Sequence, residues 1–338
     1  MRIAVLGAGA VGGTLAALLA RQGHELEVTA RGEQLAAIRA EGIQLDGGFG
    51  THNARVAAGE TLTRRPDLVI LATKAQDAAG ALAGSLATIE GVPLLVVQNG
   101  IGGLKDAGEL LPTSTVYGGL ALFAASYLSP GRVTVTAPLP LIIGTVPSVE
   151  ERAAGTLHET ITWLAEILRP AIPIEITPDI EGAQWTKLLI NHVNALPAIT
   201  GLSVQQIVAD AGTRRVMTAS MRETVRLVRR IGVRFAAVQG VSGAVLNLIG
   251  VAPLAVGQAF PRLLARRMGD VPNPGSTLQS IRRGRLTEID FLNGAVVTAA
   301  REHGLTAPIN AQIVDLVHEV ERTGVFLTPA QVADRVTF

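Results

Sequence analysis

The chain has 338 residues, a length that suits two domains with a hydrophobic core each. Its 48% hydrophobic and 17% charged residues are typical of a well-buried globular protein and exclude a disordered one. A net charge of +1 gives no bulk attraction to nucleic acid or an anionic membrane. The lack of cysteine excludes disulfides and thiolate chemistry, and the six histidines lack metal-binding spacing, so we expect no metal.

The first predicted elements are a short apolar strand at Arg2–Leu6, a glycine-rich turn, and a helix to about Arg21. A G-x-G-x-x-G turn between a strand and a helix is typical of dinucleotide-binding folds. The first glycine permits the tight turn, the second lets a pyrophosphate approach the backbone, and the third lets helix and strand pack closely. The residues expected to bind the dinucleotide here are Gly7, Gly9, Ala10, Val11 and Gly12.

The second predicted strand, Glu25–Ala30, ends at Arg31. In such folds the residue at this strand tip contacts the adenosine ribose. A carboxylate there would bind the 2′-hydroxyl, whereas an arginine suits a 2′-phosphate. Arg31 therefore predicts NADP(H) in preference to NAD(H).

Strands and helices go on alternating. A β-rich stretch covers Ile43–Ala57, apolar strands cover Asp67–Thr73 and Pro93–Val97, and a helix runs from Asp77 to about Ile89. Continuous apolar strands separated by helices indicate a parallel sheet covered on both faces. The predicted class is α/β, with an N-terminal Rossmann-type doubly wound sheet.

Lys74 directly follows one of these apolar strands, and Asn99 stands in the Gln98-Asn99-Gly100 sequence that follows another. Ligands of open parallel sheets bind outside the carboxyl ends of the strands. Both side chains are therefore expected where a nicotinamide and its substrate would lie. The alternative is that Lys74 solvates a loop and that Asn99-Gly100 forms a turn.

The pattern changes near Pro178-Asp179. Before this point we expect a hairpin around Ser129-Pro-Gly131, a helix from about Pro147 to Leu168 and a strand at Ile174–Ile176. Beyond it the apolar residues recur at helical spacing. Residues 1–178 are thus predicted to be an NADP(H)-binding Rossmann domain and residues 179–338 an all-helical substrate-binding domain. The helices expected there are Gly182–Ile199, Val204–Ile231, Ser276–His303 and Asn310–Thr323.

One stretch, Phe235–Pro261, carries no charged residue. Its glycines, prolines, Asn247 and glutamines dilute its hydropathy below that of a spanning helix. We expect either a buried helical hairpin or a contact between copies of the chain in a homodimer, and no membrane span. No basic and apolar leader precedes Arg2, which favours a cytoplasmic protein.

The first helix of the second domain carries a narrow polar stripe. Lys187, Asn191 and Asn194 stand at i, i+4 and i+7, and most of the remaining surface is apolar. Such a stripe suits the wall of a polar pocket. The alternative is a core helix whose polar strip faces water or a neighbouring backbone.

Lysine is scarce, because only Lys74, Lys105 and Lys187 among the 29 basic residues are lysine. Where a cation serves only solvation, this chain uses arginine. A desolvated amine can release a proton at accessible pH, whereas a guanidinium cannot. Lys187 is therefore a candidate proton donor.

A second constellation lies in the helix expected over Ser276–His303. On a continuous helix Glu288 would share an inward face with Ile281 and Ala295, and Asp290 would point away. A carboxylate on an apolar face needs a partner, because burying an unpaired charge costs several kcal/mol. Lys187 or a substrate could be that partner, and an internal salt bridge with Arg285 is the alternative.

Taken together, these stretches resemble the ketopantoate reductase (2-dehydropantoate 2-reductase) family from residue 1 to about residue 325. The resemblance rests on Gly7-x-Gly9-x-x-Gly12, Lys74, Gln98-Asn99-Gly100, Trp185-x-Lys187-x-x-x-Asn191, Asn273-x-x-Ser276 and Thr287-Glu288-Ile-Asp-x-x-Asn-Gly294. It implies NADPH-dependent reduction of a 2-oxo acid to a 2-hydroxy acid, in pantothenate and coenzyme A synthesis.

The resemblance also implies roles for individual residues. Lys187 would be the general acid, Glu288 would bind the substrate hydroxyl and hold the lysine, and Asn99 would orient both lysine and substrate. The residues implied to bind the substrate are Asn191, Asn194, Asn273 and Ser276. Arg31 and Lys74 would bind the cofactor phosphates or ribose, with Asn99 also on the cofactor side.

The chain departs from the family pattern at three places. Asn194 stands seven residues after the lysine where eight is common, Ser280 replaces a frequent aspartate, and the stretch from about Val238 to Asp270 is long and apolar. These departures concern the substrate more than the reaction. A bulkier 2-oxo acid is thus an alternative substrate, and a non-catalytic sensor of NADP(H) is an alternative function.

Overall fold

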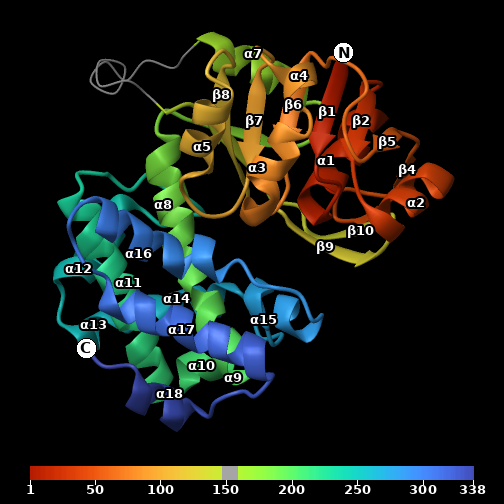
Figure 1. The fold of residues 1–338 in the computed structure, drawn as a ribbon. Coiled ribbons are helices and arrows are strands. Elements are labelled where there is room, and N and C mark those ends of the chain that lie inside the picture. Colours follow the sequence, from red (N-terminus) through yellow and green to blue (C-terminus); the bar gives the residue numbers. More distant parts are fainter. Residues whose placement is uncertain (147–158) are drawn as a thin grey trace. The chain divides into compact units, whose positions relative to one another are not determined.

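The computed structural model describes residues 1–146 and 159–338 (Figure 1). The chain divides into two compact units, Met1–Ile180 and Glu181–Phe338. Of the helix expected over Pro147–Leu168, residues 147–158 lie outside the described residues. The described remainder forms α7, Glu159–Leu168.

An eight-stranded sheet forms the centre of the first unit, in the order β12-β11-β8-β7-β6-β1-β2-β5. Neighbouring strands run parallel, apart from β8 and β11, which run antiparallel. The chain leaves β1 towards β2 on one side and returns to β6 on the other, so the strand order reverses between β1 and β6. The strands are β1 (Arg2–Leu6), β2 (Glu25–Thr29), β5 (Ala57–Gly59), β6 (Leu68–Leu71), β7 (Leu94–Val97), β8 (Val116–Ala121), β11 (Leu141–Gly144) and β12 (Ile174–Thr177).

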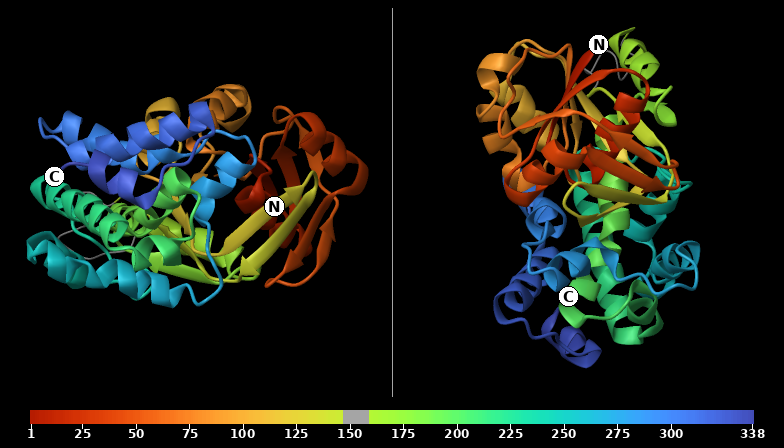
Figure 2. Two further views of the ribbon diagram at one scale, coloured as in Figure 1. Left: turned by 90° about the horizontal axis from the view of Figure 1, so that it is seen from below. Right: turned by 90° about the vertical axis from the view of Figure 1, so that its right-hand side faces the viewer.

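A second, four-stranded sheet has the order β4-β3-β10-β9. Its strands are β3 (Ile43–Gly47), β4 (His52–Ala54), β9 (Ala124–Ser129) and β10 (Arg132–Ala137). The antiparallel β9–β10 pair confirms the hairpin predicted around Ser129-Pro-Gly131. β3 pairs in parallel with β10, so two segments distant in sequence lie side by side; β9 and β10 can be followed in yellow in Figure 2.

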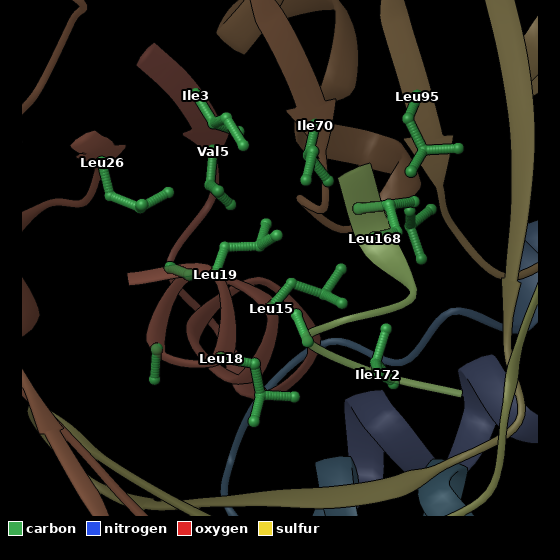
Figure 3. Close-up of a cluster of buried hydrophobic side chains, with 14 of the residues drawn as sticks. Ile3, Val5, Leu15, Leu18, Leu19, Leu26, Ile70, Leu95, Leu168 and Ile172 are labelled. Atoms are coloured by element: carbon green, nitrogen blue, oxygen red, sulfur yellow. The ribbon is translucent and has the colours of Figure 1, made fainter. Parts of the chain in front are cut away.

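The core of the first unit is formed where the helix after β1 packs on the sheet. Figure 3 shows Ile3 and Val5 of β1 and Ile70 of β6 beside Leu15 and Leu19 of that helix. The residues of β6 and β7 are buried throughout, so the central strands are covered on both faces, as their unbroken apolar sequences predict. The helices of this unit are α1 (Ala10–Arg21), α2 (Gly32–Glu41), α3 (Ala75–Ala83), α4 (Leu86–Ile89), α5 (Gly103–Leu110) and α7.

The second unit is helical, and Figure 2 shows coiled ribbons throughout it. The predicted class, an α/β sheet domain followed by a helical domain, is confirmed. Its elements are α8 (Ile180–Asn191), η1 (His192–Asn194), α9 (Ala195–Thr200), α10 (Val204–Ala209), α11 (Ala211–Arg230), α12 (Gly243–Val251), α13 (Leu254–Gly257), α14 (Ala259–Arg267), α15 (Gly275–Arg282), η2 (Ile289–Phe291), α16 (Asn293–Glu302), α17 (Pro308–Thr323) and α18 (Pro329–Arg335).

The single helix predicted over Ser276–His303 is wrong, because the chain forms α15, η2 and α16 instead. α15 ends in a Schellman motif: the Gly284 N–H donates to Ile281 and the Arg285 N–H to Ser280. Gly284 has a φ of 62°, which glycine adopts without the steric cost of a side chain. Glu288 therefore lies in a connection between helices rather than on a helix face.

Three other predicted helices are interrupted. Gly182–Ile199 is divided by the 3₁₀ turn η1 between α8 and α9. Val204–Ile231 divides at Asp210, whose carboxylate accepts from the Thr213 N–H at 2.8 Å and so begins α11 as a helix cap. The helix expected from Asp77 divides into α3 and α4 at Gly84-Ser85. In each of these segments the apolar spacing continues across a short interruption of the α-helix.

The uncharged stretch Phe235–Pro261 forms a loop, α12, α13 and the start of α14. Leu246, Ile249 and Phe260 are buried, but Leu248, Val251 and Val256 are about 60% exposed. The expectation of a buried hairpin is therefore wrong for Val245, Leu248, Val251 and Val256, and a homodimer contact stays a prediction. Within the described residues, no helix is both long and apolar enough to cross a membrane.

A buried polar network connects α11, α16 and α17. The side-chain oxygen of Asn310 accepts hydrogen bonds from Ser220 Oγ at 2.9 Å and from Asn293 Nδ2 at 2.8 Å. Asn310 Nδ2 donates to Glu223 Oε2 at 2.7 Å. Since Asn293 is the first residue of α16, this network holds the end of the Glu288 connection to two other helices.

His192 of η1 joins the same network. Its Nε2 lies 2.9 Å from Thr224 Oγ1, and the Thr224 hydroxyl donates to the Ser220 carbonyl at 3.1 Å. Because the hydroxyl proton is used on that carbonyl, the ring nitrogen is the donor to Thr224. Burial lowers the pKa of His192 to about 3, so the ring is neutral at physiological pH.

Removing the Asn310 amide should destabilise the second unit strongly. Asn310→Ala removes the acceptor of the buried Ser220 hydroxyl and Asn293 amide and one of the donors to Glu223, and we expect a loss of roughly 2–4 kcal/mol in the free energy of unfolding. Urea denaturation measures it. The matched control Asn247→Ala, at an exposed site on α12, should change stability by under ~0.5 kcal/mol. Equal effects of the two substitutions would contradict the network's role.

Candidate active site

The glycine turn of the first unit has the geometry that its three glycines predict. Gly7 has a φ of 96°, and a Cβ added there would lie 2.7 Å from Thr73 Cγ2. A Cβ at Gly12 would clash with the carbonyl oxygen of Gly7 and come within 3.0 Å of Ala72 Cβ. A Cβ at Gly9, in contrast, meets no atom within 4 Å. The turn is thus closed on its inner side and open at Gly9, as a pyrophosphate cradle at a helix start requires.

The turn lies at the point where the strand order reverses. The contact of Gly7 with Thr73 places the end of β1 beside the end of β6, and Lys74 follows directly as the residue before α3. Ligands of doubly wound sheets bind in this crevice, outside the carboxyl ends of the strands. Asn99 follows the neighbouring strand β7 at the same edge of the sheet.

Arg31 stands after β2, also at this edge, as the residue before α2. Its side chain is exposed, and it makes no hydrogen bond or ion pair with any residue that the structure describes. A guanidinium in this setting remains able to bind a phosphate.

The sequence pattern did not reveal that two glutamines, Gln34 and Gln98, form hydrogen bonds around the glycine turn. Gln34 Nε2 donates to the Ala8 carbonyl at 2.6 Å, and Gln34 Oε1 accepts from the Gly131 N–H at 2.7 Å. Gln98 Nε2 donates to the Thr73 carbonyl at 3.0 Å. Gln98 belongs to the Gln98-Asn99-Gly100 motif, but nothing in the spacing of Gln34 indicates that it connects the glycine turn to the β9–β10 hairpin.

In the second unit, α8 and η1 carry the predicted polar stripe. Lys187, Asn191 and Asn194 are each partly exposed, while Leu188, Leu189 and Val193 between them are at most 1% exposed. The helix is therefore enclosed in protein except along this strip. This is the arrangement expected of a pocket wall.

Glu288 lies close enough to Lys187 to affect the charge of the lysine. Burial lowers the pKa of Lys187 to about 8, and the Glu288 carboxylate opposes that shift. The first effect disfavours the ammonium because it is removed from water, and the second favours it by charge attraction. The result is an amine that can both hold and release a proton near neutral pH, which suits a general acid.

Asn194 lies beside the turn that carries Asn273 and Ser276. A Cβ on Gly275 would come 2.6 Å from Asn194 Oδ1, so only a glycine fits there. Asn273 Oδ1 accepts from the Gly275 N–H at 2.9 Å and shapes this turn, while Ser276 is exposed in the first turn of α15. The second unit thus brings the α8 stripe together with Glu288 at one point and with the Asn273–Ser276 turn at another.

A parallel sheet with a glycine turn at its switch point, followed by a helical unit with a lysine–carboxylate pair, defines a class: the dinucleotide-dependent oxidoreductases with a helical second domain. The chain belongs to the ketopantoate reductase family within that class. The family description "Ketopantoate reductase PanE/ApbA" matches residues 3–148, and its C-terminal counterpart matches residues 179–321. Membership supports a nicotinamide cofactor.

Curated relatives match the chain along nearly its whole length. The 2-dehydropantoate 2-reductase of Mesorhizobium japonicum is 31% identical over 346 residues, covering 95% of this chain and 98% of the relative. That of Pyrococcus horikoshii is 27% identical over 329 residues, covering 96% and 99%.

Solved structures match as well. A PanE/ApbA family ketopantoate reductase from Ralstonia eutropha is 28% identical, with a TM-score of 0.78 over 95% of this chain and 99% of the other. A D-mandelate dehydrogenase with NADH and anilino(oxo)acetate has the same TM-score of 0.78 over 96% and 99%. At 21% identity, that likeness concerns the fold alone.

The open side of the glycine turn can be tested with a pair of matched alanine substitutions. Gly9→Ala should leave the melting temperature unchanged, because its Cβ meets no protein atom, yet weaken NADPH binding at least ~10-fold by occupying the pyrophosphate's space. Gly12→Ala should lower stability by roughly 1–3 kcal/mol, because α1 must move. Thermal denaturation measures the stability of each variant, and fluorescence titration with NADPH measures its affinity for the cofactor. Unchanged NADPH affinity in Gly9→Ala would contradict the assignment.

Proposed function

We propose that this protein reduces 2-dehydropantoate (ketopantoate) to pantoate with NADPH. The observation that carries the proposal is the Lys187 amine, brought to a pKa of about 8 beside Glu288 on a polar strip of an otherwise buried helix. Relatives named 2-dehydropantoate 2-reductase that match along the whole chain support the substrate. The reaction would serve pantothenate and coenzyme A synthesis in the cytoplasm.

Lys187 is the proposed general acid. When bound, the reduced nicotinamide supplies a hydride from C4 to the carbonyl carbon of the 2-oxo acid. Negative charge then develops on the carbonyl oxygen as its π bond breaks, and the ammonium of Lys187 stabilises this charge and transfers a proton to it. The lysine is left neutral and regains its proton from water. Glu288 keeps the amine protonated beforehand and accepts a hydrogen bond from the substrate hydroxyl.

The remaining residues of the polar stripe bind the substrate in this proposal. Asn191 and Asn194 present amides along the same strip as Lys187, and the Asn273–Ser276 turn beside Asn194 offers the exposed Ser276 hydroxyl. Asn99, after β7, is proposed to orient the substrate carbonyl and the lysine. Residues 179–338 would thus be the substrate-binding domain.

The cofactor would be bound by residues 1–178. The glycine turn, with Ala10 and Val11 at the start of α1, holds the pyrophosphate on backbone N–H groups. Lys74 contacts the phosphates or ribose, and Arg31 binds the 2′-phosphate that distinguishes NADPH from NADH.

A comparison of substrates tests the proposed function. NADPH oxidation is followed with ketopantoate and with a panel of 2-oxo acids, including a bulky aromatic one. We expect the highest kcat/KM for ketopantoate, and Lys187→Ala should lower kcat ~10²–10⁴-fold while NADPH affinity stays within a few-fold. Preference for another 2-oxo acid would replace the substrate, and no turnover with any ketone would indicate an NADP(H) sensor.

The pH dependence of the rate should report the pKa of Lys187. Because the acid must be protonated, kcat/KM should be level below pH 8 and fall ~10-fold per pH unit above it. Glu288→Gln removes the charge that raises this pKa, so the break should move below pH 8. Asp290→Asn is the matched control, since Asp290 is exposed and pairs with His318, and should leave the break in place. An unmoved break in Glu288→Gln would show that Glu288 does not act on the amine.

The cofactor preference should depend on Arg31. Arg31→Asp replaces a charge-assisted hydrogen bond to phosphate by repulsion, so kcat/KM with NADPH should fall ~10²-fold while that with NADH changes little or rises. Arg169→Asp makes the same change of net charge at another exposed position of the first unit and serves as the control. If the NADPH-to-NADH ratio is the same in both variants, Arg31 does not bind the 2′-phosphate.

A further inference from the structure

A cavity of about 420 Å³ lies within the second unit, apart from the α8 stripe. It is open to solvent on one side, where Arg226 and Arg230 are exposed, and it is bounded by α11, α13, the start of α17 and Phe338. Figure 1 shows the C-terminus next to α13. The volume is within the range of small-molecule sites, roughly 300–1,000 Å³. None of the residues proposed for the reductase reaction lines this cavity.

Three arginines of α11 line the cavity: Arg222, Arg226 and Arg230. Residues four apart share one face of a helix, and at about 1.5 Å rise per residue the row extends over roughly 12 Å. The Nε atoms of Arg222 and Arg226 both approach the Gly250 carbonyl oxygen, at 3.5 and 3.0 Å. This shared oxygen holds the two side chains side by side. The whole chain has a net charge of only +1, so three cations on one cavity wall are a local concentration.

None of these three arginines forms an ion pair with a carboxylate that the structure describes. Glu223 also lines the cavity, but its Oε1 accepts from the Ile309 N–H at 3.0 Å and its Oε2 from the backbone and side chain of Asn310 at 2.9 and 2.7 Å. Burial and the like charge of Arg226 lower the pKa of Arg222, so the positive charges of this row repel one another.

The rest of the lining is mostly apolar. It comprises Ala219, Leu227, Leu254, Leu305, Pro308, Ile309 and Phe338, with Thr306 as a further polar residue. A cavity with one cationic wall and apolar remaining walls suits a ligand with an anionic head and a hydrophobic body. Guanidinium groups match phosphate in particular, because their planar N–H pairs bind two oxygens at once.

We propose that this cavity binds a small phosphate monoester that carries an apolar group, at a site separate from the reductase site. The row of arginines binds the phosphate, and the leucines with Ile309 and Phe338 contact the apolar group. The anion forms the ion pairs that the three arginines do not form within the described residues.

The test is isothermal titration calorimetry of the full chain with phenyl phosphate. NADP⁺ is present at saturation, so that phosphate-binding groups for the cofactor do not contribute. Phenyl phosphate should bind more tightly than inorganic phosphate, and neutral benzyl alcohol should give no measurable heat up to about 10 mM. Arg226→Gln and Arg230→Gln should each weaken phenyl phosphate binding roughly 10-fold, as expected for loss of one charge-assisted hydrogen bond.

Arg301→Gln is the matched control, because Arg301 is exposed on α16 outside the cavity, and it should bind phenyl phosphate as the parent does. Equal melting temperatures establish that the variants are folded. Binding that is absent, or that survives both Arg226→Gln and Arg230→Gln, would overturn the proposal. Since binding is measured without a 2-oxo acid, the outcome is independent of whether the protein reduces ketopantoate.

Discussion

The central constraint on this protein is the placement of one ammonium group on a helix that is otherwise enclosed in protein. Removing a charge from water costs free energy, and the low pKa of Lys187 expresses that cost. Glu288 recovers part of it by charge attraction. An amine balanced in this way is poorly suited to stabilising a fold but well suited to proton transfer. The structure around Lys187 and Glu288 therefore has to hold these two side chains in place.

The chain positions Lys187 and Glu288 by ending helices early and connecting the helix ends through hydrogen bonds. A Schellman motif at Gly284 stops α15, so that the Thr287–Glu288 connection leaves the helix axis. Asn293 and Asn310 then anchor the end of this connection in the buried network, and His192, five residues after Lys187, reaches the same network through Thr224. Lys187 and Glu288 are thus attached to a common set of buried hydrogen bonds, which are directional and costly to leave unmade.

Local patterns predicted most elements of the first unit. The glycine turn, the strands Arg2–Leu6, Asp67–Thr73 and Pro93–Val97, and the Ser129-Pro-Gly131 hairpin depend on residues close in sequence, and the structure confirms each. The positions at which one helix ends and the next begins were predicted least well from the sequence. At Asp210 and Gly284 the apolar spacing continues across the break, and only the backbone hydrogen bonds show where one helix stops. For the uncharged stretch, composition indicated burial, yet Leu248, Val251 and Val256 are exposed, since composition does not say which side of a short helix meets the core.

The sequence by itself determined the class of the protein, the cofactor-binding turn and the identity of the candidate acid. They follow from short-range rules, glycine where no side chain fits and helical spacing of polar residues, together with the rarity of lysine in the composition. Only the tertiary structure decided that β3 pairs with β10, that Gln34 joins the glycine turn to a distant hairpin, and that three arginines of α11 share a cavity with the end of the chain. These contacts join residues far apart in sequence. They arise from how complete elements pack, which no local pattern specifies.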